Sequence, residues 1–193
     1  MKGRVRRSSQ LAGMMVGCAI ATTAFVRGDI VAAAIGGMVG GVMYALAVEW
    51  MNSWTRRGLI KKYGEVPVEL PVRPRLAMTV YAPYDCVADV VLGAISEFAR
   101  LNSVSKEGAN AMQVLADIPR SIRHGSGELL DVCVAGHEVG GVRVVIASRP
   151  RHDSTIIDFG RNMSHVLRIK DAVVKAVGRA QIELESVGES GPV

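Results

Sequence analysis

The side chains that most often perform catalysis or bind metals are few in this chain, and they are scattered along it. The histidines are His124, His137, His152 and His165. No two of them have a metal-ligand spacing such as His-x-x-x-His. Asp131, Cys133 and His137 resemble a nucleophile set, but strand alternation places the first two on one face and His137 beyond a glycine turn. We therefore expect no catalytic residue, no metal and no cofactor.

Two glycine-bearing stretches, 124–127 and 136–141, have a composition that can hold a phosphate. Neither carries a full Gly-x-Gly-x-x-Gly or Walker pattern, and neither leads directly into a helix. We interpret both stretches as hairpin turns.

The segment 147–162 is the most specific local feature, because it combines several basic residues with the start of a helix. The candidate anion-binding or partner-binding residues are Arg149, Arg151, His152 and Arg161. A helix N-terminus adds backbone amides and a favourable dipole for anions. We expect a site for an acidic partner, a phospholipid headgroup or a phosphate; the alternative is a solvated basic loop.

The same stretch resembles the C-terminal motif of an uncharacterised bacterial family of membrane-associated domains. That motif has a strand ending in Ser-Arg, then Asp-x-Gly-x-Asn opening a helix, and a later Arg-Ile pair. The matching residues are Ser148, Arg149, Asp158, Gly160, Asn162, Arg168 and Ile169, within about twenty residues. The resemblance implies no particular chemistry.

The elements that position these residues follow from the hydrophobic pattern. A strand is predicted from Leu76, a helix with Asp85 as its N-cap, and then a polar stretch, 103–111, that reads as a mobile loop. Four strands and a last helix are predicted at 112–118, 129–135, 142–148, 154–159 and from 160–162 onward. This order, β-α-β-β-β-β-α, predicts an α+β domain whose antiparallel sheet carries both helices on one face. By topology it resembles TATA-box-binding-protein-like and helix-grip folds, an analogy that supplies no function.

Two apolar runs, 11–26 and 30–48, precede this domain and are separated by three residues. The second run is uncharged over nearly the ~20 residues that cross a bilayer. Basic residues flank the pair: Lys2, Arg4, Arg6 and Arg7 before it, and Arg56, Arg57, Lys61 and Lys62 after it. The sequence therefore predicts a transmembrane hairpin in a bacterial cytoplasmic (inner) membrane with both termini cytoplasmic. A cleaved signal peptide within residues 1–26, of the ordinary or the lipoprotein kind, is the alternative for the first run.

Glycines at four-residue spacing lie in both runs. They are Gly13, Gly17, Gly36, Gly37, Gly40 and Gly41. Small residues at this spacing let helix backbones approach closely in lipid. They either pack the two arms of the hairpin together or contact another subunit.

The net charge of +5 and the three cysteines limit the remaining possibilities. The basic residues cluster at the membrane flanks, so lipid is favoured over nucleic acid as their partner. An odd, sparse cysteine set fits reduced thiols in a cytosolic domain.

We divide the chain into a basic flank with the hairpin (1–57), a Pro-containing linker (58–74), a cytosolic α+β domain (75–187) and a polar tail (188–193). The leading interpretation is a non-enzymatic membrane subunit whose domain binds a protein partner or assembles as a homo-oligomer. A tethered domain that binds a lipid or small apolar ligand is the second interpretation, and an enzyme is the third.

Overall fold

The structure is a computed structural model that describes residues 30–64, 66–67, 70–119, 127–136, 140–152, 158 and 160–189. The chain divides into two compact units, 1–61 and 62–193, and each is treated by itself. The first expected membrane span, 11–26, and the possible signal peptide lie outside the described residues.

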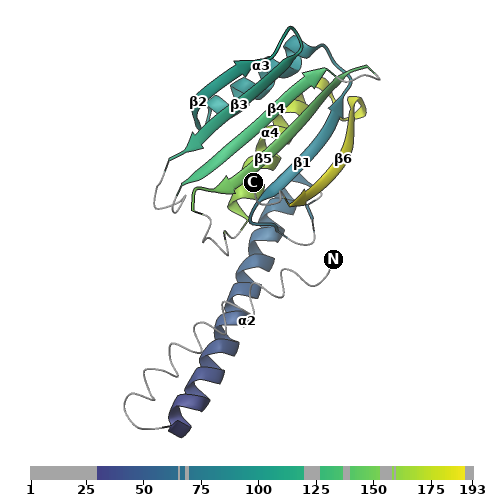
Figure 1. Cartoon of the computed structure of the whole chain (residues 1–193). Coiled ribbons are helices and arrows are strands. Elements are labelled where there is room, and N and C mark those ends of the chain that lie inside the picture. Colours follow the sequence, from purple (N-terminus) through teal and green to yellow (C-terminus); the bar gives the residue numbers. More distant parts are fainter. Residues whose placement is uncertain are drawn as a thin grey trace. The chain divides into compact units, whose positions relative to one another are not determined.

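In the N-terminal unit the described element is α2 (Ile30–Tyr63), a helix of 34 residues (Figure 1). At 1.5 Å per residue its length is about 51 Å. Its apolar side chains are not confined to one face, and large ones are exposed along most of its length. Among the described residues it is the one helix that is long and apolar enough to cross a membrane. The helix continues through Gly58 to Tyr63, so it includes the first residues of the segment expected as a linker.

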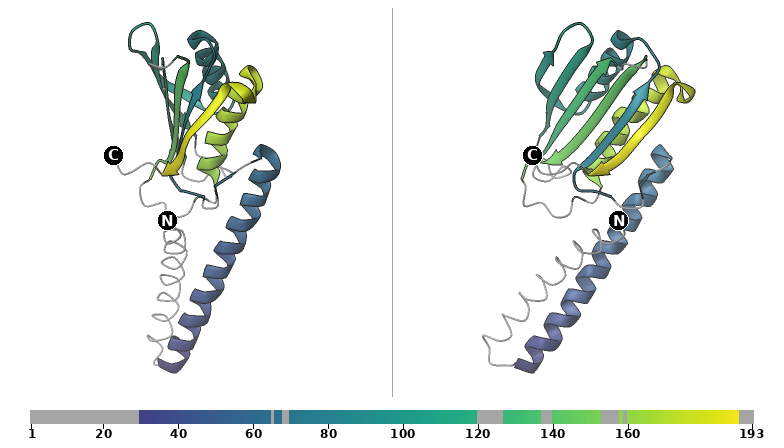
Figure 2. Two further views of the ribbon diagram at one scale, coloured as in Figure 1. Left: turned by 90° about the vertical axis from the view of Figure 1, so that its right-hand side faces the viewer. Right: turned by 45° about the vertical axis from the view of Figure 1, so that its right-hand side comes forward.

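The C-terminal unit is an α+β domain with a six-stranded antiparallel sheet. The strands are β1 (Pro74–Val80), β2 (Arg100–Lys106), β3 (Ala111–Ile118), β4 (Glu128–Gly136), β5 (Val142–Pro150) and β6 (Ile182–Glu189). Their order across the sheet is β2-β3-β4-β5-β1-β6, so β1 lies between β5 and β6. The helices α3 (Tyr84–Ser96) and α4 (Arg161–Val177) cover one face of this sheet, and a short 3-10 helix, η1 (Arg179–Gln181), leads into β6 (Figures 1 and 2).

The core lies between the sheet and the two helices, and it forms because strand and helix periodicities present apolar residues to the same layer. The strands contribute Leu76, Met78, Val80, Met112, Val114, Leu130, Val132, Val134, Val144 and Ile146, and the helices contribute Val87, Val91, Ile95, Val166, Ile169 and Val173. These buried residues are Val, Leu, Ile and Met, as the low aromatic content predicts.

The two helices and the strands β1, β3, β4 and β5 were predicted, whereas β2 and β6 were not. The polar stretch read as a mobile loop contributes most of β2. The segment after the last helix, read as its end followed by a tail, forms β6. The expected strand 154–159 is not among the strands of the described chain; Asp158 has no regular structure, and its neighbours there lie outside the described residues. The predicted N-cap was also wrong, since Pro83 is the cap of α3 and Asp85 lies in its first turn.

Candidate functional site

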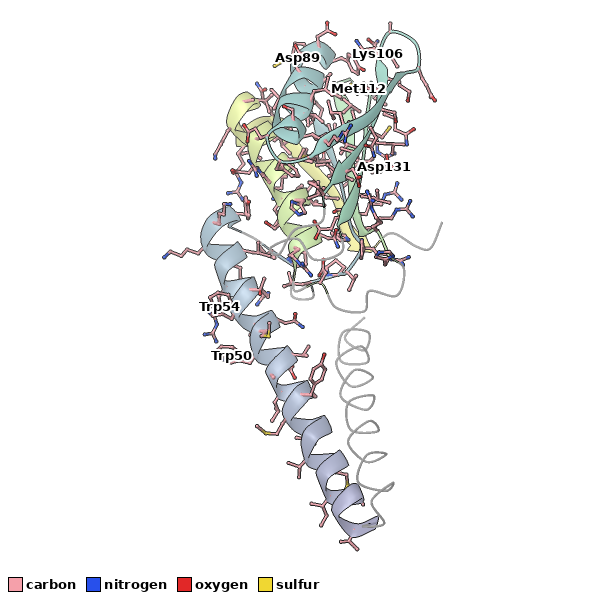
Figure 3. The ribbon with its side chains drawn as sticks, turned by 90° about the vertical axis from the view of Figure 1, so that its left-hand side faces the viewer. Trp50, Trp54, Asp89, Lys106, Met112 and Asp131 are labelled. Atoms are coloured by element: carbon pink, nitrogen blue, oxygen red, sulfur yellow. The ribbon has the colours of Figure 1, made fainter. Side chains whose placement is uncertain are left out.

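One face of the sheet carries α3 and α4, and the described elements leave the opposite face uncovered (Figure 2). We call this surface the open face. In β5 the residues Val144 and Ile146 are buried under the helices, whereas Arg143 and Arg149 are exposed on the open face. In Figure 3 Asp131 of β4 lies on the side of the sheet away from the helices.

Two arginines from neighbouring strands meet at one corner of the open face. Arg75 of β1 is paired across the ladder with Ala147 of β5, two residues before Arg149. Arg75 and Arg149 are therefore diagonal neighbours, with Cα atoms roughly 7–8 Å apart. Arg151 follows directly after β5. We call Arg75, Arg149 and Arg151 the arginine corner.

The members of the arginine corner differ in their partners. Arg151 forms an ion pair with Asp117 of β3, whereas Arg75 and Arg149 form no hydrogen bond or ion pair with any described residue. A second carboxylate of the open face, Asp131 of β4, is diagonal to Arg149. It accepts a hydrogen bond from Nε2 of Gln113 at 3.0 Å. Two guanidiniums on adjacent strands thus keep their planar arrays of N–H donors available to an external group.

The opposite end of the open face has its charges paired. Nε of Arg143 donates to both carboxylate oxygens of Glu185 at 3.2 and 3.0 Å, and the Thr79 hydroxyl donates to Glu185 at 2.8 Å. The Tyr81 hydroxyl donates to Glu183 at 3.0 Å, and this hydrogen bond raises the pKa of Tyr81. Arg143 is therefore a neutralised arginine on the same face as the arginine corner.

Arg161 does not join the arginine corner. It is the first residue of α4, and its Nε donates to the backbone carbonyl of Asp158 at 3.0 Å. The neighbouring Asn162 accepts a hydrogen bond from Ser148, which points to the helix-covered face, whereas Arg149 points to the open face. Of the residues expected to form one basic site, Arg149 and Arg151 thus come together, and Arg161 lies on the other side of the sheet. His152 is exposed next to Arg151.

The N-terminus of α4, expected to attract an external anion, is occupied by a carboxylate of the chain itself. Asp158 accepts hydrogen bonds from the backbone N–H groups of Gly160 and Asn162, both at 2.9 Å. Gly160 is the N-cap and has a left-handed backbone, which brings the chain round so that these amides face the carboxylate. Burial of the carboxyl raises the pKa of Asp158, although these hydrogen bonds and Arg161 act in the opposite direction.

Five buried polar side chains gather where α4 meets the ends of β4 and β5. We call them the buried polar layer: Glu128, Ser148, Asp158, Asn162 and His165. Oγ of Ser148 donates to Oδ1 of Asn162 at 2.6 Å, and Nδ2 of Asn162 donates to the carbonyl of Val72 at 2.9 Å. Asn162 therefore joins α4 to β5 and to the chain entering β1. Ser148, Asp158 and Asn162 are also residues of the sequence motif, so the motif has a structural role in this chain.

His165 forms the second part of the buried polar layer. Its Nε2 lies 2.7 Å from Oε2 of Glu128, and its ring stacks on Phe98 with centroids 5.2 Å apart. The guanidinium of Arg168 also lies over the Phe98 ring, 4.6 Å from its centroid. Arg168 forms an ion pair with Glu97 at 2.8 Å. This series of contacts holds α4 against β4 and against the segment that follows α3.

The other candidate residues are placed without forming a site. Asp131 and Cys133 point to the open face, and His137 lies outside the described residues. Gly36, Gly37, Gly40 and Gly41 lie in α2, whereas Gly13 and Gly17 are outside the described chain. Within the described part of the chain no three His, Cys, Asp or Glu residues are grouped as metal ligands.

Sequence reasoning missed Arg75, Glu128 and the pairing of His165. Arg75 lies 74 positions before Arg149, and only the insertion of β1 beside β5 brings them together. Glu128 and His165 are each isolated in the sequence, so no local spacing reveals their contact. The available signal was alternation, because Arg75 directly precedes the strand predicted from Leu76 and falls on the exposed phase of its pattern.

No protein-family model matches the chain, and no curated protein matches it in sequence.

Proposed function

We propose that this protein is a non-enzymatic, membrane-anchored binding module. In this proposal α2 crosses the membrane as the second arm of a helical hairpin whose first arm is 11–26. The α+β domain lies in the cytoplasm and presents its open face to a partner.

The observation that supports anchoring best is the exposed apolar surface of α2. Val31 and Met38 are 69% and 68% exposed, and Val39, Val42 and Leu46 are more than half exposed. In water, such a continuous apolar surface on one long helix is unfavourable, at roughly 25 cal/mol per Å². In a bilayer the same side chains contact apolar lipid tails instead of water, and the helix satisfies its own backbone hydrogen bonds.

The end of α2 has the residues that belong at a membrane surface. Trp50 and Trp54 are 68% and 69% exposed and lie on the helix just after the uncharged run (Figure 3). Arg56, Arg57 and Lys61 follow. Tryptophan is favoured at the headgroup level and basic residues on the cytoplasmic side, so the proposed orientation has the domain in the cytoplasm.

The domain supports a binding role rather than a catalytic one. The buried polar layer is hydrogen-bonded within itself and holds elements together. Arg75 and Arg149, which have no partner among the described residues, lie on the open face. A protein partner, or a second copy joined through the glycines of α2, would use surfaces outside the core.

Membrane fractionation of the full-length chain tests anchoring. We expect the wild-type protein to remain with membranes after alkaline extraction. Val39→Arg/Val42→Arg should shift it to the soluble or aggregated fraction, because arginine near the centre of a span costs about 2.5–3.5 kcal/mol. Val104→Arg is the matched control, since Val104 is also an exposed valine but lies in β2 of the domain. Release of the wild-type chain by alkali, or equal behaviour of the two variants, would contradict anchoring.

A further inference from the structure

We infer that the arginine corner binds the phosphate of an anionic phospholipid headgroup. This inference deepens the proposed function, since it names the ligand class of the open face. It begins from a geometric fact: Arg75 and Arg149 are diagonal neighbours on adjacent strands, both exposed, and neither has a partner among the described residues.

The chemistry of the two side chains favours phosphate. A guanidinium presents a planar fork of N–H groups that matches the oxygens of phosphate in a bidentate manner. Side chains from diagonal positions about 7–8 Å apart are long enough to converge on one tetrahedral anion. Arg151 is paired with Asp117, which neutralises its charge, so the free donors of the arginine corner are those of Arg75 and Arg149.

Two carboxylates on this part of the sheet reduce its net positive charge. Asp117 is paired with Arg151, and Asp131 is hydrogen-bonded to Gln113. Three arginines against two carboxylates leave a net charge of +1 (3 − 2), so the attraction is local to the two free guanidiniums. Such a site suits a ligand present at high local concentration, as headgroups are at a membrane surface.

The position of Arg75 in the chain favours a headgroup over a soluble anion. Arg75 is the second residue of β1, and α2 ends at Tyr63. The ten residues between Tyr63 and Pro74 span at most about 35 Å, so an anchored α2 keeps the start of β1 within reach of the bilayer surface. The alternative ligand of the arginine corner is an acidic protein segment. The experiment below distinguishes it from a headgroup by comparing binding of vesicles with binding of poly-glutamate.

The experiment uses the full chain in phosphatidylcholine nanodiscs, mixed with sedimentable vesicles of phosphatidylcholine alone or with phosphatidylglycerol. We expect sedimentation with the phosphatidylglycerol vesicles only. Arg75→Ala/Arg149→Ala should weaken it about thirty-fold, at about five-fold for each basic residue near an anionic surface. Arg143→Ala is the matched control, because Arg143 is an arginine on the same face that Glu185 already neutralises; its binding should stay within about two-fold. Arg75→Lys/Arg149→Lys should fall between the two, since lysine keeps the charge and loses the bidentate fork.

Several outcomes overturn the inference. Equal binding of the double alanine variant and the wild type would show that the corner is a solvated basic surface. Binding of inorganic phosphate that depends on Arg75 and Arg149, beyond that of chloride at equal ionic strength and without vesicle binding, would assign a free-anion site. Binding of poly-glutamate that depends on Arg75 and Arg149, without vesicle binding, would assign an acidic protein partner. Because the double variant still contains α2, its alkaline extraction stays as in the wild type, so failure here is separate from failure of anchoring.

Discussion

Replacing Asn162 by alanine should strongly destabilise the domain, because this one side chain connects three segments. Asn162 is fully buried, accepts from Ser148 and donates to the carbonyl of Val72. Each hydrogen bond contributes about 1 kcal/mol net, and each buried group left without a partner costs about 1–3 kcal/mol. We expect Asn162→Ala to lower the free energy of unfolding by about 2–4 kcal/mol.

A double-mutant cycle with Ser148→Ala makes the expectation sharper. Ser148→Ala removes only the shared hydrogen bond, so it should cost about 1–2 kcal/mol. If the two side chains bond each other, the double variant loses less than the sum of the single variants, with a coupling of about 1 kcal/mol. Additive effects, or a loss below about 1 kcal/mol for Asn162→Ala, would refute this role.

The assay must report on the domain itself. Both tryptophans, Trp50 and Trp54, lie in α2, so tryptophan fluorescence reports on this helix and not on unfolding of the α+β domain. Hydrogen exchange of the α4 amides under native conditions is suitable, because the amide of Ser164 bonds to the carbonyl of Gly160 in the first turn. Faster exchange of α4 in Asn162→Ala, with α2 unchanged, is the expected pattern.

Three further predictions concern the same domain. Because burial raises the pKa of Asp158, its contribution to stability is fully present below the unfolded pKa of about 3.9 and is lost as pH rises through the folded pKa; Asp158→Asn should flatten this part of the stability profile, and an unchanged profile would contradict it. Gly93→Ala in α3 should stabilise by about 0.5–1 kcal/mol, since an added Cβ meets nothing within 4 Å and alanine favours helix; a lower denaturation midpoint would contradict it. Gly141→Ala should destabilise by about 2 kcal/mol or more, because the Cβ would lie 2.8 Å from the Val80 carbonyl oxygen at a φ of +93°; a midpoint equal to the wild type would refute the strain.

Periodicity was sufficient to predict the elements that face the core. The helix α4 was predicted because Val166, Ile169 and Val173 repeat at helical spacing, and all three are buried. The central strands were predicted because every second residue is apolar. In β5, for example, Val142, Val144 and Ile146 are buried, whereas Arg143 between them is exposed.

The edge strands could not be predicted in the same way. Every residue of β2 is exposed, so its sequence shows no alternation of buried apolar and exposed polar residues. Its strand structure depends on pairing with β3. The same holds for β6. Glu185 bonds to Thr79 of β1 and Arg143 of β5, and Glu183 bonds to Tyr81, which follows β1; all three partners are far away in sequence. Pairing between distant segments also explains why Arg75 was absent from the predicted basic site.

The central claim is that α2 holds the domain in a membrane with the domain on the cytoplasmic side. Cys86 and Cys133 are free, exposed thiols in the domain and provide natural probes. In a Cys18→Ser chain, a membrane-impermeant maleimide should label both in inside-out vesicles of the cytoplasmic membrane, and in right-side-out vesicles only after detergent is added. Labelling of intact right-side-out vesicles, or recovery of the labelled chain free of membrane, would contradict the account.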